Sequence, residues 1–228
     1  ADKPLFKIAP AIVLASAFGA LAAVPYSSTL YIADFNIGIF FLAAITSLEA
    51  IGILMAGWAS NNKWALLGGM RSAAQIVSYE IPTSLAILTA IILAGTMSLQ
   101  GIIYVQLGPD NWQQGGFWQW NIFSSPFMLV LAPAYFLAAL AECNRTPFDI
   151  PEAESELVAG YHTEYTGMRF AFFFMAEYAM MCVLSAVAVT IFLGGWSTGI
   201  PGFEPLMLES TGTYDMSTGQ MLVAPSYY

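Results

Sequence analysis

Five segments of the chain stay apolar over about 17–25 residues, which is the length needed to cross a hydrocarbon layer of about 30 Å. Lipid offers the backbone no hydrogen-bond partners, so an open chain crosses it only as helix. We therefore predict an all-α fold, a polytopic membrane helix bundle with five transmembrane helices. Aromatic residues near the segment ends, such as Tyr26, Trp58 and Trp196, fit the interfacial belt of membrane proteins. The predicted spans cover residues 8–24, 35–56, 75–99, 122–141 and 170–193.

Polar stretches divide the chain into a transmembrane domain, residues 1–196, and a tail, residues 197–228. Residues 57–74 and 142–169 are the two polar connections that we expect to form cytoplasmic loops. The tail is rich in Gly, Pro, Ser and Thr and contains no further apolar span, so we expect it to be irregular and non-cytoplasmic.

The basic residues predict the orientation in the membrane. None lies in the connections after the first and third spans or in the tail, so all of them fall on one side, which the positive-inside rule makes the cytoplasmic side. They are Lys3 and Lys7 before the first span, Lys63 and Arg71 between the second and third, and Arg145 and Arg169 between the fourth and fifth.

Composition excludes several classes of protein. Charged residues make up 9% of the chain and hydrophobic residues 58%, whereas a soluble domain carries about a quarter charged residues. The net charge of −9 with six basic residues and no basic patch excludes a nucleic-acid partner. Cys143 and Cys182 have no spacing typical of a disulfide framework, a metal site or an iron–sulfur site.

Three carboxylates lie within predicted spans: Glu49, Glu80 and Glu177. A charge in the middle of a membrane costs about 2.5–3.5 kcal/mol on insertion scales, so such residues usually face the bundle interior or a watery cavity. Counted at about 1.5 Å per residue, all three fall in the half of the membrane next to the long acidic loop. They either carry function or form hydrogen bonds between helices. Glu177 follows a phenylalanine-rich stripe, so we expect it to be neutral or paired with a base.

The acidic loop between the fourth and fifth spans has its own pattern. Asp149 and Glu152 predict the start of a helix that Gly160 would end. Arg145 is expected to hold the loop by pairing with its carboxylates. Such crowding of acids forms either a solvated surface or a site that awaits a partner. The six carboxylates are Glu142, Asp149, Glu152, Glu154, Glu156 and Glu164.

Three motifs, in this order along the chain, resemble the H subunit of bacterial NADH–quinone oxidoreductase, respiratory complex I, whose mitochondrial counterpart is subunit 1. The first begins at Ala56 with AGWASNNK, continues as LLGGMRSAAQ and ends in SYE at Glu80. The second is AECNRTPFD from Ala141, followed by EAESELV from Glu152. The third is FFFMAEY from Phe172. The resemblance covers about residues 1–196.

The resemblance implies a subunit of a translocating enzyme that helps to form the quinone chamber and couples quinone reduction to proton translocation. Quinone would be a substrate, with no covalently bound cofactor and no NADH, flavin or iron–sulfur site in this chain. Its partners would be membrane-arm and peripheral-arm subunits and the lipid of a bacterial inner membrane. The chamber and coupling residues implied by the motifs are Arg71, Glu80, Glu142, Arg145, Asp149, Glu152, Glu154, Glu156, Glu164 and Glu177.

The resemblance also has departures. Members of that family have eight spans, and the first span and the last two have no counterpart among the five predicted here. We therefore expect a fragment or a split gene product. Two alternatives remain open: the equivalent subunit of a membrane-bound hydrogenase-type complex, and a cation channel or transporter with an acidic vestibule.

Overall fold

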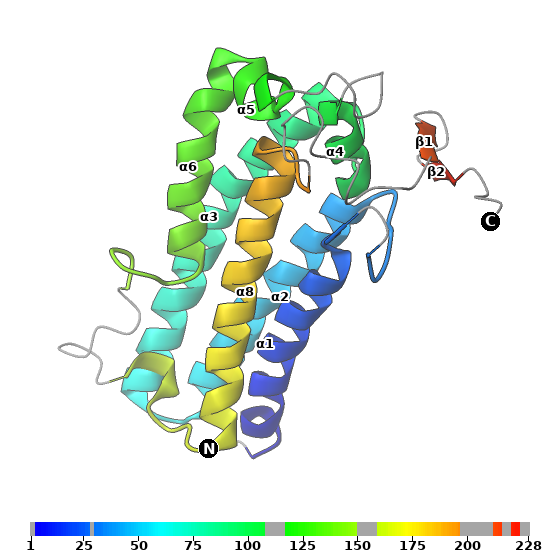
Figure 1. Ribbon diagram of the computed structural model, residues 1–228. Helices are drawn as coiled ribbons and strands as arrows, with labels where there is room; N and C mark the ends of the chain where they lie inside the picture. Colours follow the sequence, from blue (N-terminus) through cyan, green and yellow to red (C-terminus); the bar gives the residue numbers. More distant parts are fainter. Residues whose placement is uncertain are drawn as a thin grey trace. The chain divides into compact units, whose positions relative to one another are not determined.

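The computed structural model describes residues 3–27, 30–107, 117–149, 159–196, 212–215 and 220–223. Helices make up most of the described residues, as Figure 1 shows. The elements are α1 (Lys3–Ala23), α2 (Gly38–Ala59), α3 (Lys63–Ala94), α4 (Leu99–Leu107), η1 (Phe117–Gln119), α5 (Asn121–Ser124), α6 (Pro126–Glu142), η2 (Gly160–His162), α8 (Met168–Phe192), β1 (Gly212–Asp215) and β2 (Gln220–Val223).

The five predicted spans correspond to α1, α2, α3, α6 and α8, which confirms the all-α fold class. Four of these helices are long and apolar enough to cross a membrane: α1, α2, α3 and α8. The fifth, α6, is also apolar but has 17 residues, near the lower limit for a span.

The predicted loop at residues 57–74 is wrong, because α2 runs to Ala59 and α3 begins at Lys63. A short turn replaces the loop. Asn61 takes a left-handed backbone conformation there, with φ 54°, and the Asn62 side chain accepts a hydrogen bond from the backbone N–H of Trp64 at 3.1 Å. Residues after Lys63 are mostly strong helix formers, so the polar character of this stretch marks a helix end at the membrane surface rather than a loop.

Two further differences from the predicted pattern concern α4 and the tail. α3 ends at Ala94, where Gly95 adopts φ 69°, and the buried helix α4 follows in residues that carried no separate prediction. In the tail, β1 and β2 pair antiparallel with Gly212 opposite Val223, so this part is not irregular. Thr, Tyr and Val in these strands favour extended backbone.

The chain folds as two compact units. Unit 1 comprises residues 1–21, 43–84 and 136–184, and unit 2 comprises residues 22–42, 85–135 and 185–228. Each unit is assembled from segments far apart in the sequence.

A hydrophobic core of unit 1 combines small alanine side chains with aliphatic and aromatic ones. Gly52 on α2 faces Val13 on α1 so closely that a Cβ atom would clash with the valine side chain. Such close packing suits helices that associate in lipid, where small residues let backbones approach. The core residues are Ala9, Val13, Ala17, Ala50, Ile53, Ala56, Ile76, Tyr161, Tyr165, Phe173 and Ala176.

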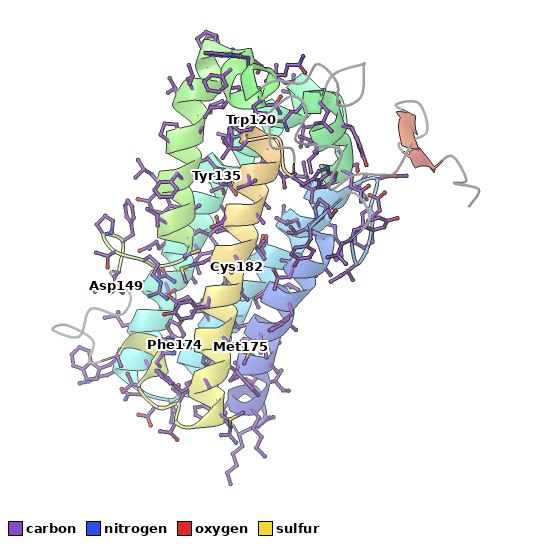
Figure 2. All side chains as sticks on the ribbon, in the orientation of Figure 1. Trp120, Tyr135, Asp149, Phe174, Met175 and Cys182 are labelled. Carbon is purple, nitrogen blue, oxygen red and sulfur yellow. The ribbon has the colours of Figure 1, made fainter. Side chains whose placement is uncertain are left out.

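Unit 2 is organised around aromatic side chains and buried amides. Tyr135 on α6 is 1% exposed and lies 5.6 Å from the Phe192 ring of α8, centroid to centroid. Figure 2 marks Tyr135 and Trp120 among the side chains of this unit. Tyr104 of α4 packs edge-on against Trp196 at 6.0 Å.

Candidate functional site

An arginine and a membrane glutamate form the central contact of unit 1. Arg145 lies on the turn after α6, and its Nε is 3.1 Å from Oε1 of Glu177 on α8. The Arg145 guanidinium also lies over the Tyr178 ring, 4.9 Å from its centroid. Glu177 is therefore paired with a base, which is one of the two states predicted for it. The acid that Arg145 contacts here lies in a transmembrane helix and not in the acidic loop.

The turn that carries Arg145 is a regular helix termination. Asn144 has φ 50°, the backbone N–H of Asn144 donates to the Ala141 carbonyl at 3.2 Å, and that of Arg145 donates to the Leu140 carbonyl at 3.1 Å. This pair of bonds is the Schellman motif, which satisfies carbonyls at the end of a helix. Asn is one of the residues that tolerate the left-handed conformation, so the sequence contained a signal for this turn.

The Gln75 side chain on α3 forms hydrogen bonds with the same turn. Its Nε2 donates to the carbonyls of Ala141 at 2.8 Å and Phe148 at 2.7 Å, and it lies 3.2 Å from Oδ1 of Asn144. The predicted site residues do not include Gln75, because a glutamine near the end of a span gives no chemical signal of its own. Its position in the motif that ends at Glu80 was the available clue.

Two buried acids lie near the ion pair. Glu142, the last residue of α6, is 5% exposed, and Glu49 on α2 is 7% exposed. The carboxylates of Glu142 and Glu177 both act electrostatically on Glu49. The Thr83 hydroxyl is within hydrogen-bonding reach of Glu142, whose Oε2 has no hydrogen-bond partner among the described residues. The predicted site had left out Glu49, which the fold brings to this cluster.

Glu80 extends the cluster along α3. Its Oε1 accepts a hydrogen bond from the Ser47 hydroxyl of α2, and its charge acts on Glu142. Glu80 and Gln75 thus face different elements, α2 and the turn after α6, as their positions on one helix require. The acids that the fold gathers in unit 1 are Glu49, Glu80, Glu142 and Glu177, and we call them the acid cluster.

The remaining predicted site residues lie outside this cluster or outside the described residues. Arg71 and Asp149 are exposed, and Figure 2 shows Asp149 on the turn after α6. Glu164 is exposed and accepts a hydrogen bond from Asn62 Nδ2 at 2.9 Å. Glu152, Glu154 and Glu156, with the helix predicted to follow Asp149, fall among residues 150–158, which the structure does not describe.

The turn after α6 is shielded from water at Cys143, which is 6% exposed. Burial raises the pKa of the Cys143 thiol above its ordinary value, neighbouring carboxylates raise it further, and Arg145 lowers it. The neighbouring carboxylates are those of Glu49, Glu142 and Glu177.

The end of the acidic loop, residues 159–167, is held against α2 and α3. A Cβ on Gly68 would lie 2.7 Å from the Gly160 Cα, so only glycine permits this approach of helix and loop. The Tyr165 ring stacks on Phe6 at 4.1 Å, and its hydroxyl lies 3.5 Å from the Ala56 carbonyl. Burial raises the pKa of Tyr165 to about 12, although Ser60 and Arg169 act to lower it.

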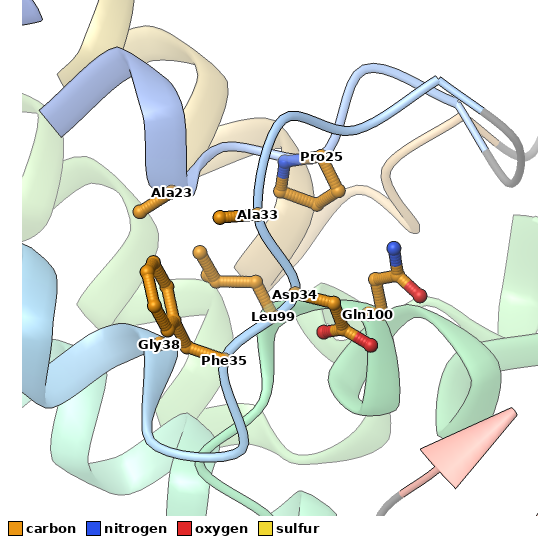
Figure 3. Close-up of a pocket in the computed structure, with 8 residues that line it drawn as sticks. All are labelled: Ala23, Pro25, Ala33, Asp34, Phe35, Gly38, Leu99 and Gln100. Carbon is orange, nitrogen blue, oxygen red and sulfur yellow. The ribbon is translucent and has the colours of Figure 1, made fainter. Parts of the chain in front are cut away.

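The described residues form hollows in both units. An open one of ≈350 Å³ lies in unit 1 at the turn between α2 and α3, lined by Trp58, Asn61, Asn62, Lys63 and Leu66. A smaller one of ≈10 Å³, room for about one water, lies in unit 2 (Figure 3). Asp34 and Gln100 line the smaller hollow with polar atoms, and partial burial raises the pKa of Asp34. Its size excludes a substrate.

The acid cluster is suited to holding and exchanging protons and to responding to a nearby charge. Within the described residues no group of three or more His, Cys, Asp or Glu side chains has the geometry of a metal site. Four acids, one pairing arginine and several hydroxyls from separate helices therefore form an electrostatic unit, since any added charge changes the balance among groups that are largely shielded from water.

Comparison with known proteins gives a consistent assignment. A family model described as NADH dehydrogenase matches residues 1–223. The chain is similar to the H subunit of NADH-quinone oxidoreductase from Chlorobaculum parvum, with 51% identity over 210 residues, 92% of this chain and 57% of the relative. It is 50% identical over 204 residues to the protein of the same name from Anaeromyxobacter dehalogenans, covering 90% of this chain and 48% of the relative. The chain spans about half the length of the curated relatives that it matches.

Proposed function

The chain belongs to the NADH dehydrogenase family, and we propose that it acts as a membrane subunit of a proton-translocating NADH–quinone oxidoreductase. In this role it forms part of the quinone chamber and couples quinone reduction to proton translocation. The relatives named as the H subunit of NADH-quinone oxidoreductase support this choice over a hydrogenase-type subunit or a free-standing channel.

The single observation that carries the coupling role is the Arg145–Glu177 contact at 3.1 Å beside buried acids. Arg145 brings a positive charge into direct contact with the acid cluster. When a negative charge forms on quinone near the turn, Arg145 is attracted to it and its hold on Glu177 weakens. Glu177 then gains affinity for a proton, because desolvation disfavours an unpaired carboxylate.

The other acids relay this change. Glu49 interacts with Glu177 and with Glu142, and Glu142 interacts with Glu80. A proton taken up by one member lowers the cost of ionising the next, so charge shifts between α8, α2, α6 and α3 without a covalent step. The electrons and the two protons of quinone reduction come from outside this chain. The coupling acts on neighbouring membrane subunits.

Orientation and location follow from the same role. We place the turn after α6, the turn between α2 and α3, and the start of α8 on the cytoplasmic side of a bacterial inner membrane. The one-sided distribution of Lys and Arg supports this orientation. The partners would be the peripheral-arm subunits on that side and further membrane-arm subunits within the bilayer.

Replacing Glu177 tests the coupling role. Glu177→Gln keeps the shape of the side chain and removes its titration, so we expect a normally assembled complex with quinone reduction and proton pumping reduced at least about tenfold. Glu177→Ala should also weaken assembly, because it leaves the Arg145 guanidinium without an acceptor, whereas the amide oxygen of Gln can still accept a hydrogen bond from it. Quinone reduction and pumping are measured in membranes of cells that carry each variant. Wild-type pumping in Glu177→Gln would remove this residue from the mechanism.

A further inference from the structure

The Gln75 amide bridges the two ends of the turn that carries Arg145. Its two shortest hydrogen bonds, 2.8 and 2.7 Å, run to the carbonyls of Ala141 before the turn and Phe148 after it. An amide nitrogen has two hydrogens, so these two bonds use its full donor capacity. One side chain of α3 thereby sets the distance between the start and the end of the turn.

A second contact one helical turn earlier reinforces this arrangement. The Ser72 hydroxyl accepts a hydrogen bond from Asn144 Nδ2 at 3.2 Å, and Ser72 is fully buried. Residues three apart on a helix share a face, so Ser72 and Gln75 form one polar seat on α3 for the turn. The Tyr79 ring continues the contact, 5.4 Å from the Phe148 ring, centroid to centroid.

The helix termination by itself does not define the whole turn. The Schellman bonds hold the chain from Leu140 to Arg145, and a further backbone bond joins Phe148 N–H to the Arg145 carbonyl at 2.7 Å. The bond from Gln75 to the Phe148 carbonyl is the described hydrogen bond that ties the far end of the turn to a transmembrane helix. Arg145 lies between these two anchors, with its guanidinium on Glu177.

We propose that Gln75 is the positioning residue of the acid cluster: its amide clamps the turn so that Arg145 reaches Glu177. The role of this clamp in turnover rests on the proposed function, whereas its effect on the turn does not. Gln75 acts through Arg145 and takes no part in proton exchange.

Accessibility of Cys143 tests the clamp directly, because this thiol lies buried within the turn. In a Cys182→Ser background, Gln75→Met keeps the length of the side chain and removes both hydrogen bonds. We expect a water-soluble maleimide to label Cys143 about 10–30 times faster in Gln75→Met than in the wild type. Ser78→Ala is the matched control: Ser78 is exposed on the same helix and bonds only the Ala74 carbonyl, so its labelling rate should equal the wild-type rate.

The pH profile separates positioning from general damage. In Gln75→Glu an ionised carboxylate would face the carbonyls of Ala141 and Phe148, which repel it, whereas the protonated acid donates one hydrogen bond. Quinone reduction by Gln75→Glu should therefore fall at least about tenfold below wild type at pH 8 and recover towards pH 6. Gln75→Met should lose the same factor at both pH values.

The outcomes distinguish the two proposals. Unchanged Cys143 labelling in Gln75→Met would overturn the clamp. A wild-type pH profile in Gln75→Glu, in membranes whose quinone reduction depends on this chain, would overturn the role of the clamp in turnover. If membranes of cells that lack this chain reduced quinone as fast as wild-type membranes, the proposed function would be overturned. The labelling result would still decide the role of Gln75.

Discussion

Unit 1 and unit 2 both bury polar side chains, but they satisfy them in different ways. All six basic residues and the acid cluster lie in unit 1, whereas the sequence of unit 2 contains no Lys or Arg. In the described part of unit 2, two buried amides, those of Gln106 and Asn121, bond backbone groups of separate segments. Gln106 on α4 donates to the carbonyls of Ile102 at 3.2 Å and Thr190 at 2.9 Å.

The acceptor side of Gln106 completes this network. Its Oε1 accepts hydrogen bonds from the backbone N–H groups of Asn121 and Gly194, both at 3.1 Å, and Asn121 Nδ2 donates to the Ile191 carbonyl at 2.9 Å. These hydrogen bonds join three backbone segments, at Ile102, at Asn121 and at residues 190–194. Because an amide does not titrate, the network keeps the same charge at every pH. The comparison teaches that the acid cluster and its arginine gather in unit 1, whereas unit 2 joins its backbone segments through the neutral amides of Gln106 and Asn121.

The largest effect is expected from Arg145→Lys in unit 1. Lysine keeps the charge but loses the planar guanidinium, which contacts both Glu177 and the Tyr178 ring. We expect partial assembly and a loss of quinone reduction of about 100-fold or more, since the contacts that hold the charge of residue 145 against the acid cluster are lost. The measurements are complex assembly in native gels and quinone reduction in membranes. Full activity would mean that a point charge is sufficient, and the contrast between the units would lose its main support.

A smaller effect, on stability rather than on turnover, is expected from Gln106→Leu in unit 2. The change leaves the N–H groups of Asn121 and Gly194 buried without their acceptor, which costs about 1–3 kcal/mol for each group. We expect a lower thermal midpoint of the purified complex, but an unchanged turnover per assembled complex at 25 °C. Gln106→Glu is less suitable, because it adds a charge. A turnover defect at normal stability would show that unit 2 also takes part in the response.

The smallest effect is expected from Asp34→Asn, the acid beside the small hollow of unit 2. Partial burial raises the pKa of Asp34, so folding favours its protonated form. The protonated Asp34 carboxyl contributes its full stabilisation of the folded state below the pKa that Asp34 has in the unfolded chain. This contribution is lost as the pH rises through the pKa that Asp34 has in the folded protein. Solvent screening keeps this loss small, because the Asp34 residue is exposed. Asn removes the loss, so stability at pH 7 should stay equal or rise slightly, with no change near pH 3. Thermal unfolding at both pH values measures it, and reduced proton pumping would contradict a passive role.

Much of the fold could be predicted from local pattern. Runs of apolar residues located α1, α2, α3, α6 and α8, because backbone groups in lipid must bond within their own segment. The predicted pattern is wrong where a polar stretch of the chain predicts a loop but forms helix. Residues 63–74 are helical, and Gly68 within them permits the close approach of Gly160. Those two glycines are far apart along the chain, so no local rule contains their contact.

The candidate site divides in the same way. Arg145, Glu142, Glu80 and Glu177 could be selected from motifs and from the high cost of charge in a membrane. Gln75 could not, because a glutamine has no titration. Glu49 is singled out by the same cost of charge in a membrane, but it is not assigned to the site, because an isolated acid does not reveal its neighbours. Their roles depend on contacts with Phe148 and with Glu142 and Glu177, which only packing brings within reach.

The sequence by itself determined the class of environment, the helices and the family resemblance, because each of these depends on residue type and spacing along one segment. Only the tertiary structure decided which acids share a cluster, that Arg145 reaches Glu177, and that α3 clamps the turn between them. The physical reason is that electrostatic and hydrogen-bond energies depend on distances between atoms of different helices. Those distances result from packing of small residues such as Gly68, which the local pattern does not specify.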